Sequence, residues 1–580
     1  MKNTILKTIL IVAGLLVIPS FAAALDIMPV SEIKEGMTGT GYSVFKGAKP
    51  DPFKATIIGV VKKWRADQDL ILAELSGAGL EESGIIAGMS GSPVYIDGRM
   101  IGAVAYAWAW SRRPIAGITP IEHMIEIWDE MDRMDDGGSA SSAPISAESV
   151  ASIDIPEYGK ISMTPISTPL YMGGFGERAA AYLEENLSQY GLMPVQGGGA
   201  WDGEEIPGMD DLEPGSVIAV PMVTGDFMTA GVGTVTAREG DRIVAFGHPF
   251  FGMGNISLPM GGGSIVTVMP LQSVSFKVGN IGRVLGAVQR DHQAAIAGTV
   301  GAEAEMFPMK IIVNAPDTGR GKEFNVNIAQ IDELQIYLLM VSMIEAVDRV
   351  AGDGWVTVSY KIDGKFRDYD RRFHFEDMYF STSGVLSFYS LSKVLSLWVS
   401  HFKEVDFEEL TAEITVIQDD LYGSLRGFSL DKSEIHPGDI LTASVRILPY
   451  GTNREIKKDV EFTIPPDAPA GSYKISIHGG SSFSGMLGMS HPQNFEQWFD
   501  MLENMVPENA LVVTLHYPEQ GLQLEGHEAH GLPHTVQDTI VQDAAPNMNL
   551  FERYLRKVIK TDMVIEKSAI QTITVTKEYQ

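Results

Sequence analysis

The sequence predicts a mainly β, multi-domain protein with two β half-barrels, an α+β unit and an immunoglobulin-like β-sandwich. Three observations lead to this prediction. The chain has 580 residues, which corresponds to about three or four domains. Hydrophobic residues make up 45% of it, enough for several buried cores. Short apolar segments separated by turn residues recur along most of its length, which is typical of barrels and sandwiches.

Changes in composition divide the chain into successive parts. Asp, Gly, Ser, Ala and Pro dominate one early stretch, as expected of a linker. The expected order is a signal peptide at 1–24, a serine-bearing half-barrel at 25–134, a linker at 135–153, a histidine-bearing half-barrel at 154–320, an α+β accessory unit at 321–403, an immunoglobulin-like sandwich at 404–480 and a C-terminal α+β region at 481–580.

Two local patterns support the β assignments. Asp97-Gly98 separates two apolar segments and predicts a hairpin with a type I′ turn, because both turn residues tolerate positive φ. Thr411–Ile417 alternates apolar and polar residues near several Pro-Gly and Ala-Gly turns, which predicts a strand of the sandwich.

The N-terminus has the composition of a secretory signal. A short basic leader, Met1–Lys7, precedes the apolar run Thr8–Pro19 and the small residues Ala22–Ala24. We therefore expect export to the periplasm or the extracellular space, with no stable membrane insertion after cleavage. An uncleaved anchor is the alternative, which the short apolar core disfavours.

Charge and composition exclude several functions. The formal net charge is −30 and no basic stripe is present, which argues against nucleic-acid binding. The chain has no cysteine, which excludes thiolate chemistry. The glycine-rich Gly174–Ala179 lacks a surrounding βαβ unit, and His527, His530 and His534 lack zinc-protease spacing. We expect no cofactor and no metal.

One glycine-rich turn has the composition of a nucleophile site. Ser90 is bracketed by glycines between two apolar segments, and such a turn leaves backbone N–H groups beside the hydroxyl. Ser90 is the candidate nucleophile, with the N–H groups of Gly88 and Ser90 as the oxyanion donors. A serine needs a base, and His248, at the end of the short strand that follows Asp241, is the candidate. A plain hairpin turn is the structural alternative.

These segments resemble the SpoIVB (stage IV sporulation protein B) serine peptidase family. The resemblance covers roughly the first half of the chain, and it rests on Gly84-Ile-Ile-Ala-Gly-Met-Ser-Gly-Ser-Pro93, Asp97-Gly-Arg-Met-Ile-Gly-Ala-Val104, Gly117-Ile-Thr-Pro-Ile-Glu-His-Met124 and the stretch from Gly233-Thr-Val235 to Ala245-Phe-Gly-His248.

The resemblance implies a chymotrypsin-like double β-barrel with a catalytic serine and histidine. Two departures stand out. The family's histidine segment precedes its serine segment, whereas here the order is permuted, which a site defined by geometry tolerates. The family's acidic residue aligns with Ser76, so Glu74, Asp69 or Asp241 are the alternatives for a third member, or Ser90 and His248 act as a pair.

Two functions follow from these observations. The first is an exported serine endopeptidase that hydrolyses protein or peptide substrates through Ser90 and His248. The alternative is a catalytically weak or inactive peptidase-fold protein of the cell envelope that binds or scaffolds other proteins, with the immunoglobulin-like domain as a contact for an envelope partner. The missing acid at Ser76 favours the alternative, and the presence of both Ser90 and His248 favours the peptidase.

Overall fold

A computed structural model gives the fold. It describes residues 25–65, 68–108, 111–134, 151–155, 159–199, 206–331, 334–352, 356–367, 369–381, 406–483, 494–524, 527–529, 535–536 and 548–576. The expected signal peptide, most of the expected linker, and His530 and His534 lie outside these ranges. Strands dominate the described residues, which confirms the mainly β prediction.

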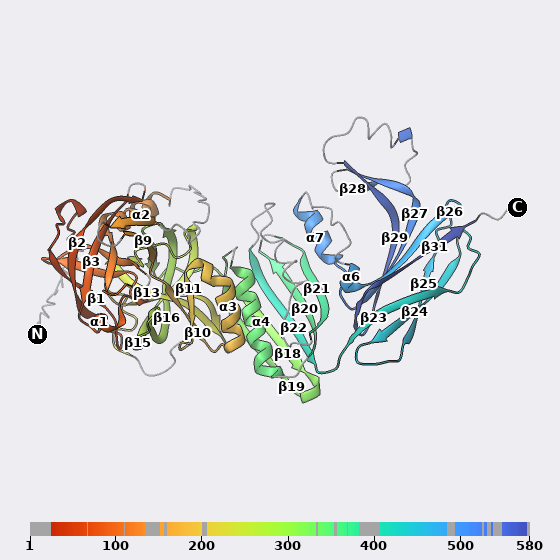
Figure 1. The fold of residues 1–580 in the computed structure, drawn as a ribbon, viewed down its shortest axis with the longest axis horizontal. Helices are drawn as coiled ribbons and strands as arrows, with labels where there is room; N and C mark the ends of the chain where they lie inside the picture. Colours follow the sequence, from red (N-terminus) through yellow and green to blue (C-terminus); the bar gives the residue numbers. More distant parts are fainter. Residues whose placement is uncertain are drawn as a thin grey trace, which may run out of the picture.

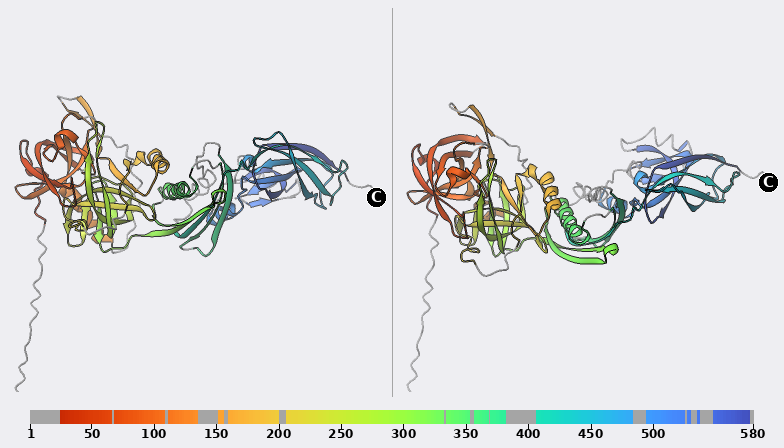
Figure 2. Two further views of the ribbon diagram at one scale, coloured as in Figure 1. Left: turned by 90° about the horizontal axis from the view of Figure 1, so that it is seen from below. Right: turned by 60° about the horizontal axis from the view of Figure 1, so that its bottom comes forward.

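Four β units follow one another along an elongated molecule. Figure 1 shows the first barrel at one end, the second barrel beside it, then a helix-covered sheet, and the C-terminal sandwich at the other end. The two views of Figure 2 show the same row of units. Within the described residues, no helix combines the length and apolarity that a membrane crossing requires.

The first barrel is a closed ring of strands. Each strand pairs with the next, and the last pairs back with the first, so the ring has no open edge. Asp97 and Gly98 join two adjacent strands of this ring, Ser92–Ile96 and Arg99–Ala107, into a hairpin. Both residues have positive φ, as a type I′ turn requires. In ring order the strands are β1 (Thr38–Ser43), β2 (Asp51–Arg65), β3 (Gln68–Ser76), β7 (Ile115–Pro120), β6 (Arg99–Ala107) and β5 (Ser92–Ile96).

Short elements complete this first unit. They are the 3-10 turn η1 (Val30–Glu32), α1 (Leu80–Ser83), β4 (Ile86–Ala87), α2 (Ile121–Met134), and the hairpin of β8 (Ala151–Ile155) and β9 (Gly159–Pro165), which joins the edge of β6.

The second barrel is also a closed ring. Its glycine-rich strands let backbones approach closely: a Cβ on Gly261 would lie 2.3 Å from the Arg283 carbonyl oxygen of the neighbouring strand. The ring consists of β12 (Val217–Gly225), β13 (Met228–Glu239), β14 (Arg242–Ala245), β17 (Ala295–Val300), β16 (Ser275–His292) and β15 (Gly254–Met269), which pairs back with β12. Beside it lie β10 (Thr168–Gly173), α3 (Glu177–Leu187), η2 (Ser188–Tyr190) and β11 (Leu192–Val195).

A helix-covered sheet continues from the second barrel. Its strands bury alternate residues, which pack against the long helix α4 (Gln335–Ala351) in one continuous core. The strands in order are β19 (Arg320–Ala329), β18 (Met306–Ala315), β22 (Phe407–Ile417), β20 (Thr357–Phe366) and β21 (Arg372–Phe380), with η3 (Pro316–Thr318) between β18 and β19.

The sandwich begins later than the sequence predicts. Thr411–Ile417 lies in β22, which pairs with β18 and β20 of the middle sheet instead. Alternating burial is the same in any strand with one covered face, so the pattern cannot tell which sheet the strand joins.

The last part of the chain is likewise not a separate unit, because its strands form the sandwich's second sheet and share its core. One sheet has β25 (Ile456–Thr463), β24 (Ile440–Pro449), β23 (Tyr422–Leu430) and β30 (Val564–Glu566). The other has β28 (His527–Ala529), β27 (Ala510–Leu524), β29 (Met548–Lys560), β26 (Gly471–Gly479) and β31 (Ser568–Val575), with α6 (Gly480–Phe483) after β26. An immunoglobulin-like topology remains a prediction.

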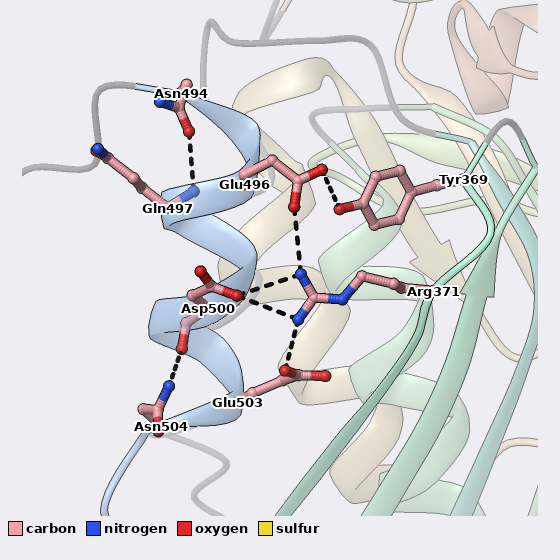
Figure 3. Close-up of polar contacts among 8 residues, drawn as sticks. All are labelled: Tyr369, Arg371, Asn494, Glu496, Gln497, Asp500, Glu503 and Asn504. Carbon is pink, nitrogen blue, oxygen red and sulfur yellow. Dashed lines mark hydrogen bonds and ion pairs between the residues drawn. The ribbon is translucent and has the colours of Figure 1, made fainter.

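Helix α7 (Phe495–Glu503) ties the C-terminal part of the chain to the middle sheet. Trp498 and Phe499 are buried in the core of that sheet. On the outer side, Figure 3 shows Arg371 reaching three acidic side chains of the helix. Its guanidinium lies 3.2 Å from Glu496, 3.1 Å from Asp500 and 2.6 Å from Glu503.

We expect the apolar contact of α7 to contribute more stability than its ion pairs. Trp498→Ala should cost about 3–5 kcal/mol because it leaves a cavity in the core. Arg371→Gln should cost much less, because the arginine is partly exposed and solvent screens its charge. Denaturant unfolding measures both losses of stability. It is followed by far-UV circular dichroism, because the signal must not depend on the tryptophan that is removed, and Trp498→Phe is the conservative control. Equal losses for the alanine and glutamine variants would contradict this ranking.

Candidate functional site

Ser90 lies in a tight turn between β4 and β5. Gly88 and Gly91 flank it with φ of 93° and 94°, values that favour glycine. The N–H groups of Met89 and Gly91 donate to the carbonyls of Ile86 (3.0 Å) and Val104 (2.8 Å). The Gly91 bond anchors the turn to β6 of the first barrel, whereas β4 on the other side of Ser90 pairs with β16 of the second barrel.

His248 follows β14 of the second barrel. The chain turns sharply before it: Phe246 has a φ of 69° and Gly247 a φ of 71°. Positive φ is strained for a bulky residue such as Phe246 and is often found at functional sites. Gly247 is held at the first barrel, because Thr119 Oγ1 donates to its carbonyl at 2.6 Å and a Cβ there would lie 2.9 Å from Ala105.

The structure brings the two segments together through Thr234 of β13. The Thr234 N–H donates to the Ser90 carbonyl at 2.8 Å, and the Thr234 carbonyl accepts from the Phe246 N–H at 3.4 Å. A Cβ on Gly91 would lie only 1.9 Å from the Thr234 oxygen and 2.6 Å from the Phe246 nitrogen. Ser90 and His248 are therefore at the contact between the two barrels, one from each.

Among the described residues, Ser90 Oγ and His248 Nε2, the candidate reactive atoms, have no polar partner. Ser90 is 0% exposed and His248 2% exposed. Within the described residues, neither Ser90 Oγ nor His248 Nε2 has a hydrogen-bond partner, so the two do not hydrogen-bond to each other in this conformation. Direct proton transfer needs them within hydrogen-bond distance, although catalytic contacts often tighten only when substrate binds.

The imidazole of His248 is held in one tautomer. Nδ1 lies 2.7 Å from the Pro249 carbonyl oxygen, and because a carbonyl only accepts, Nδ1 carries the proton. Nε2 then presents its lone pair. Burial, together with the positive charge of Arg65, lowers the pKa of His248 to about 4, although the bond to Pro249 acts in the opposite direction. The ring is neutral at pH 7 and is a weak base.

The candidate acids make contacts elsewhere. Glu74 pairs with Arg113, whose Nε lies 2.7 Å away. Asp69 accepts from the Lys62 ammonium at 2.6 Å. Within the described residues, the hydrogen bond of the His248 ring is to the Pro249 carbonyl, and no bond joins it to Glu74, Asp69 or Asp241. Ser76, aligned with the family's acid, lies at the end of β3.

The sequence reasoning missed a carboxylate that supports the histidine loop. Asp291 of β16 is buried and accepts three backbone N–H groups just after His248: Phe250 (2.8 Å), Phe251 (2.6 Å) and Gly252 (2.7 Å). Burial raises the pKa of Asp291 above its usual range, although these N–H bonds act in the opposite direction. A single Asp in a strand carries no motif, so only the fold reveals this role.

A family model with the description SpoIVB peptidase S55 matches residues 13–125 of the chain. The matched range includes the first barrel and Ser90 and ends before His248, so the resemblance to the SpoIVB peptidases is confirmed over that range. No curated protein and no solved structure matches the chain. Fold and match together describe a β-rich protein whose residues 13–125 are similar to the SpoIVB serine peptidases.

In the described part of the chain, no cluster of three or more His, Cys, Asp or Glu side chains is arranged so that it could hold a metal ion.

His248 should make the protein less stable in acid. Its pKa is about 4 in the folded protein and 6.5 in the unfolded chain, so between these values only the unfolded chain takes up the proton. Stability should therefore fall as the pH is lowered from 6.5 to 4, by up to about 3 kcal/mol from this residue. Denaturant unfolding at several pH values, beside His248→Gln, measures the difference. Parallel pH profiles for both proteins would contradict the expectation.

Asp291 should be required for an ordered loop after His248. Asp291→Asn replaces one acceptor oxygen with a donor, so at least one buried N–H loses its partner, at a cost of about 1–3 kcal/mol. Hydrogen exchange of residues 250–252 should become faster. Asp226→Asn is the matched control, since Asp226 accepts a single backbone N–H, from Asn325, near the surface. Unchanged exchange in Asp291→Asn would show that the carboxylate does not hold the loop.

Proposed function

We propose that the protein is an exported serine endopeptidase in which Ser90 and His248 act as a pair. The observation that carries the proposal is the convergence of the Ser90 turn and the segment that leads into His248 on the backbone of Thr234, which bonds Ser90 on one side and Phe246 on the other. The match of residues 13–125 to the SpoIVB peptidases supports a peptide substrate.

The chemistry follows from the two side chains. Ser90 Oγ attacks the carbonyl carbon of the peptide while His248 Nε2 takes its proton. The negative oxygen of the tetrahedral intermediate accepts hydrogen bonds from the N–H groups of Gly88 and Ser90. Nε2 then gives the proton to the leaving amine, and water, activated by the same nitrogen, hydrolyses the acyl-enzyme.

The Pro249 carbonyl takes the orienting role of the third residue in this proposal. It fixes the Nδ1–H tautomer, as an acid does in a complete triad. Unlike a carboxylate, a carbonyl has no full charge to stabilise the imidazolium, so we expect slow turnover. In the serine proteases where it was measured, replacing the acid cost about 10⁴-fold in rate.

Access and location complete the proposal. Both reactive atoms are enclosed, so substrate entry needs a movement of the residues around them. The basic and apolar N-terminus supports export to the periplasm or beyond. The sandwich, as an appended module of immunoglobulin-like type, is our proposed contact for an envelope partner.

A fluorophosphonate probe tests the nucleophile directly. We expect labelling of the wild type, no labelling of Ser90→Ala, and labelling of His248→Gln slowed by at least about 10²-fold, the usual contribution of a general base. Ser429→Ala, at an exposed serine on β23, is the matched control and should label normally.

Labelling that ignores both site substitutions, or a wild type that never reacts, would overturn the peptidase. The second result would leave the binding or scaffold function, which the enclosed and unpaired Ser90 and His248 favour.

A further inference from the structure

A buried lysine lies directly behind the serine turn. Lys277 of β16 is 0% exposed, and its ammonium donates to Ser43 Oγ at 2.8 Å. Its methylenes pack on the turn, since a Cβ on Gly88 would lie 3.2 Å from Lys277 Cδ. Within the described residues it forms no ion pair. Burying an ammonium without a carboxylate is unfavourable, so its presence here calls for a specific role.

Lys277 begins a chain of hydrogen bonds that ends in the serine turn. Ser43 Oγ lies 2.9 Å from Ser92 Oγ, and Ser92 Oγ donates to the Met89 carbonyl at 2.6 Å. The Ser92 N–H bonds the same carbonyl at 2.9 Å. A charged ammonium only donates, so Ser43 accepts from it and directs its own proton to Ser92. The Ser92 hydroxyl then donates its hydrogen bond to the carbonyl of Met89, the residue before Ser90.

We propose that Lys277 is a positioning residue for Ser90, because through Ser43 and Ser92 it fixes the Met89 carbonyl and with it the turn that carries the nucleophile. The inference rests on the proposed function and deepens it. Besides the Thr234 backbone, the second barrel thereby contributes His248 and a lysine that helps to hold the serine turn.

The chain of hydrogen bonds depends on the charge of Lys277. Burial lowers the pKa of Lys277 to about 7. A neutral amine can accept a hydrogen bond from the Ser43 hydroxyl. The direction of the hydrogen bonds from Ser43 to Ser92 is then no longer fixed. Among the described residues, no charged group acts on the Lys277 ammonium. The Phe45 ring lies 5.9 Å from it, and the Tyr171 hydroxyl, whose pKa burial raises far above its usual range, donates to the Lys277 carbonyl.

Two ionisations then bound the reactivity of Ser90. His248 must be neutral, which holds above about pH 4. Burial raises the pKa of the neighbouring Tyr106, so its hydroxyl stays neutral over this range. Lys277 must be charged, which holds below about pH 7. We expect a bell-shaped pH profile for probe labelling, with its alkaline limb due to Lys277.

The test compares Lys277→Met with the wild type. Methionine keeps the length of the side chain without its charge, so the variant should fold. At pH 6 its labelling by the fluorophosphonate should be at least about tenfold slower, and its profile should lack the fall above pH 7. Lys54→Met, at an exposed lysine on β2, is the matched control and should keep the wild-type profile. Labelling of Lys277→Met at the wild-type rate with the alkaline limb intact would overturn the proposal.

A second readout does not depend on activity. Hydrogen exchange of residues 86–95 should become faster in Lys277→Met, because the hydrogen bond from Ser92 to the Met89 carbonyl is no longer fixed through Ser43 by the ammonium. Ser43→Ala breaks the same chain one bond later without changing the lysine, and should give the same effect if Lys277→Met does not fold.

The two proposals fail separately. A wild type that the probe never labels removes the peptidase, whereas unchanged exchange of residues 86–95 in both variants removes the positioning role of Lys277.

Discussion

The candidate site depends on a contact between backbones at the junction of the two barrels. Gly91 approaches Thr234 so closely that any Cβ would overlap the carbonyl oxygen. This approach allows the Thr234 N–H to bond the Ser90 carbonyl, and the same residue bonds Phe246 on the histidine side. Closed barrels are stiff, since every strand has two neighbours, so a contact between them fixes the position of the loops they carry.

The buried polar side chains around this contact differ in how many hydrogen-bond partners offset the cost of removing them from water. Asp291 receives three N–H groups, which stabilise its charged form and hold the loop after His248. His248 has one carbonyl and remains neutral. In the part of the chain that the structure describes, the Lys277 ammonium bonds one hydroxyl and has no counter-charge. Buried ionisable side chains with few hydrogen-bond partners are typical of functional sites. At a position with a purely structural role, an apolar residue of similar size would usually be at least as stable.

Much of the fold was predictable, though its boundaries were not. The turn at Asp97-Gly98 and the mainly β character follow from local chemistry, and both are present. The allocation of strands failed at Thr411–Ile417, which has the alternation of a sandwich strand and lies in the middle sheet. Pairing of distant strands depends on which faces are buried together, and one strand's pattern is compatible with many partners.

The sequence alone determined which residues have the chemistry of a site: a serine between glycines, and a histidine after a short apolar strand, in a chain whose first part resembles the SpoIVB peptidases. The glycines are readable because a sharp turn restricts φ to values that few residues adopt. Only the tertiary structure decided what surrounds Ser90 and His248. Asp291 and Lys277 become neighbours of these segments through long-range strand pairing and burial, which no local pattern encodes. The Pro249 carbonyl is adjacent in sequence, but only the folded loop turns the His248 ring onto it.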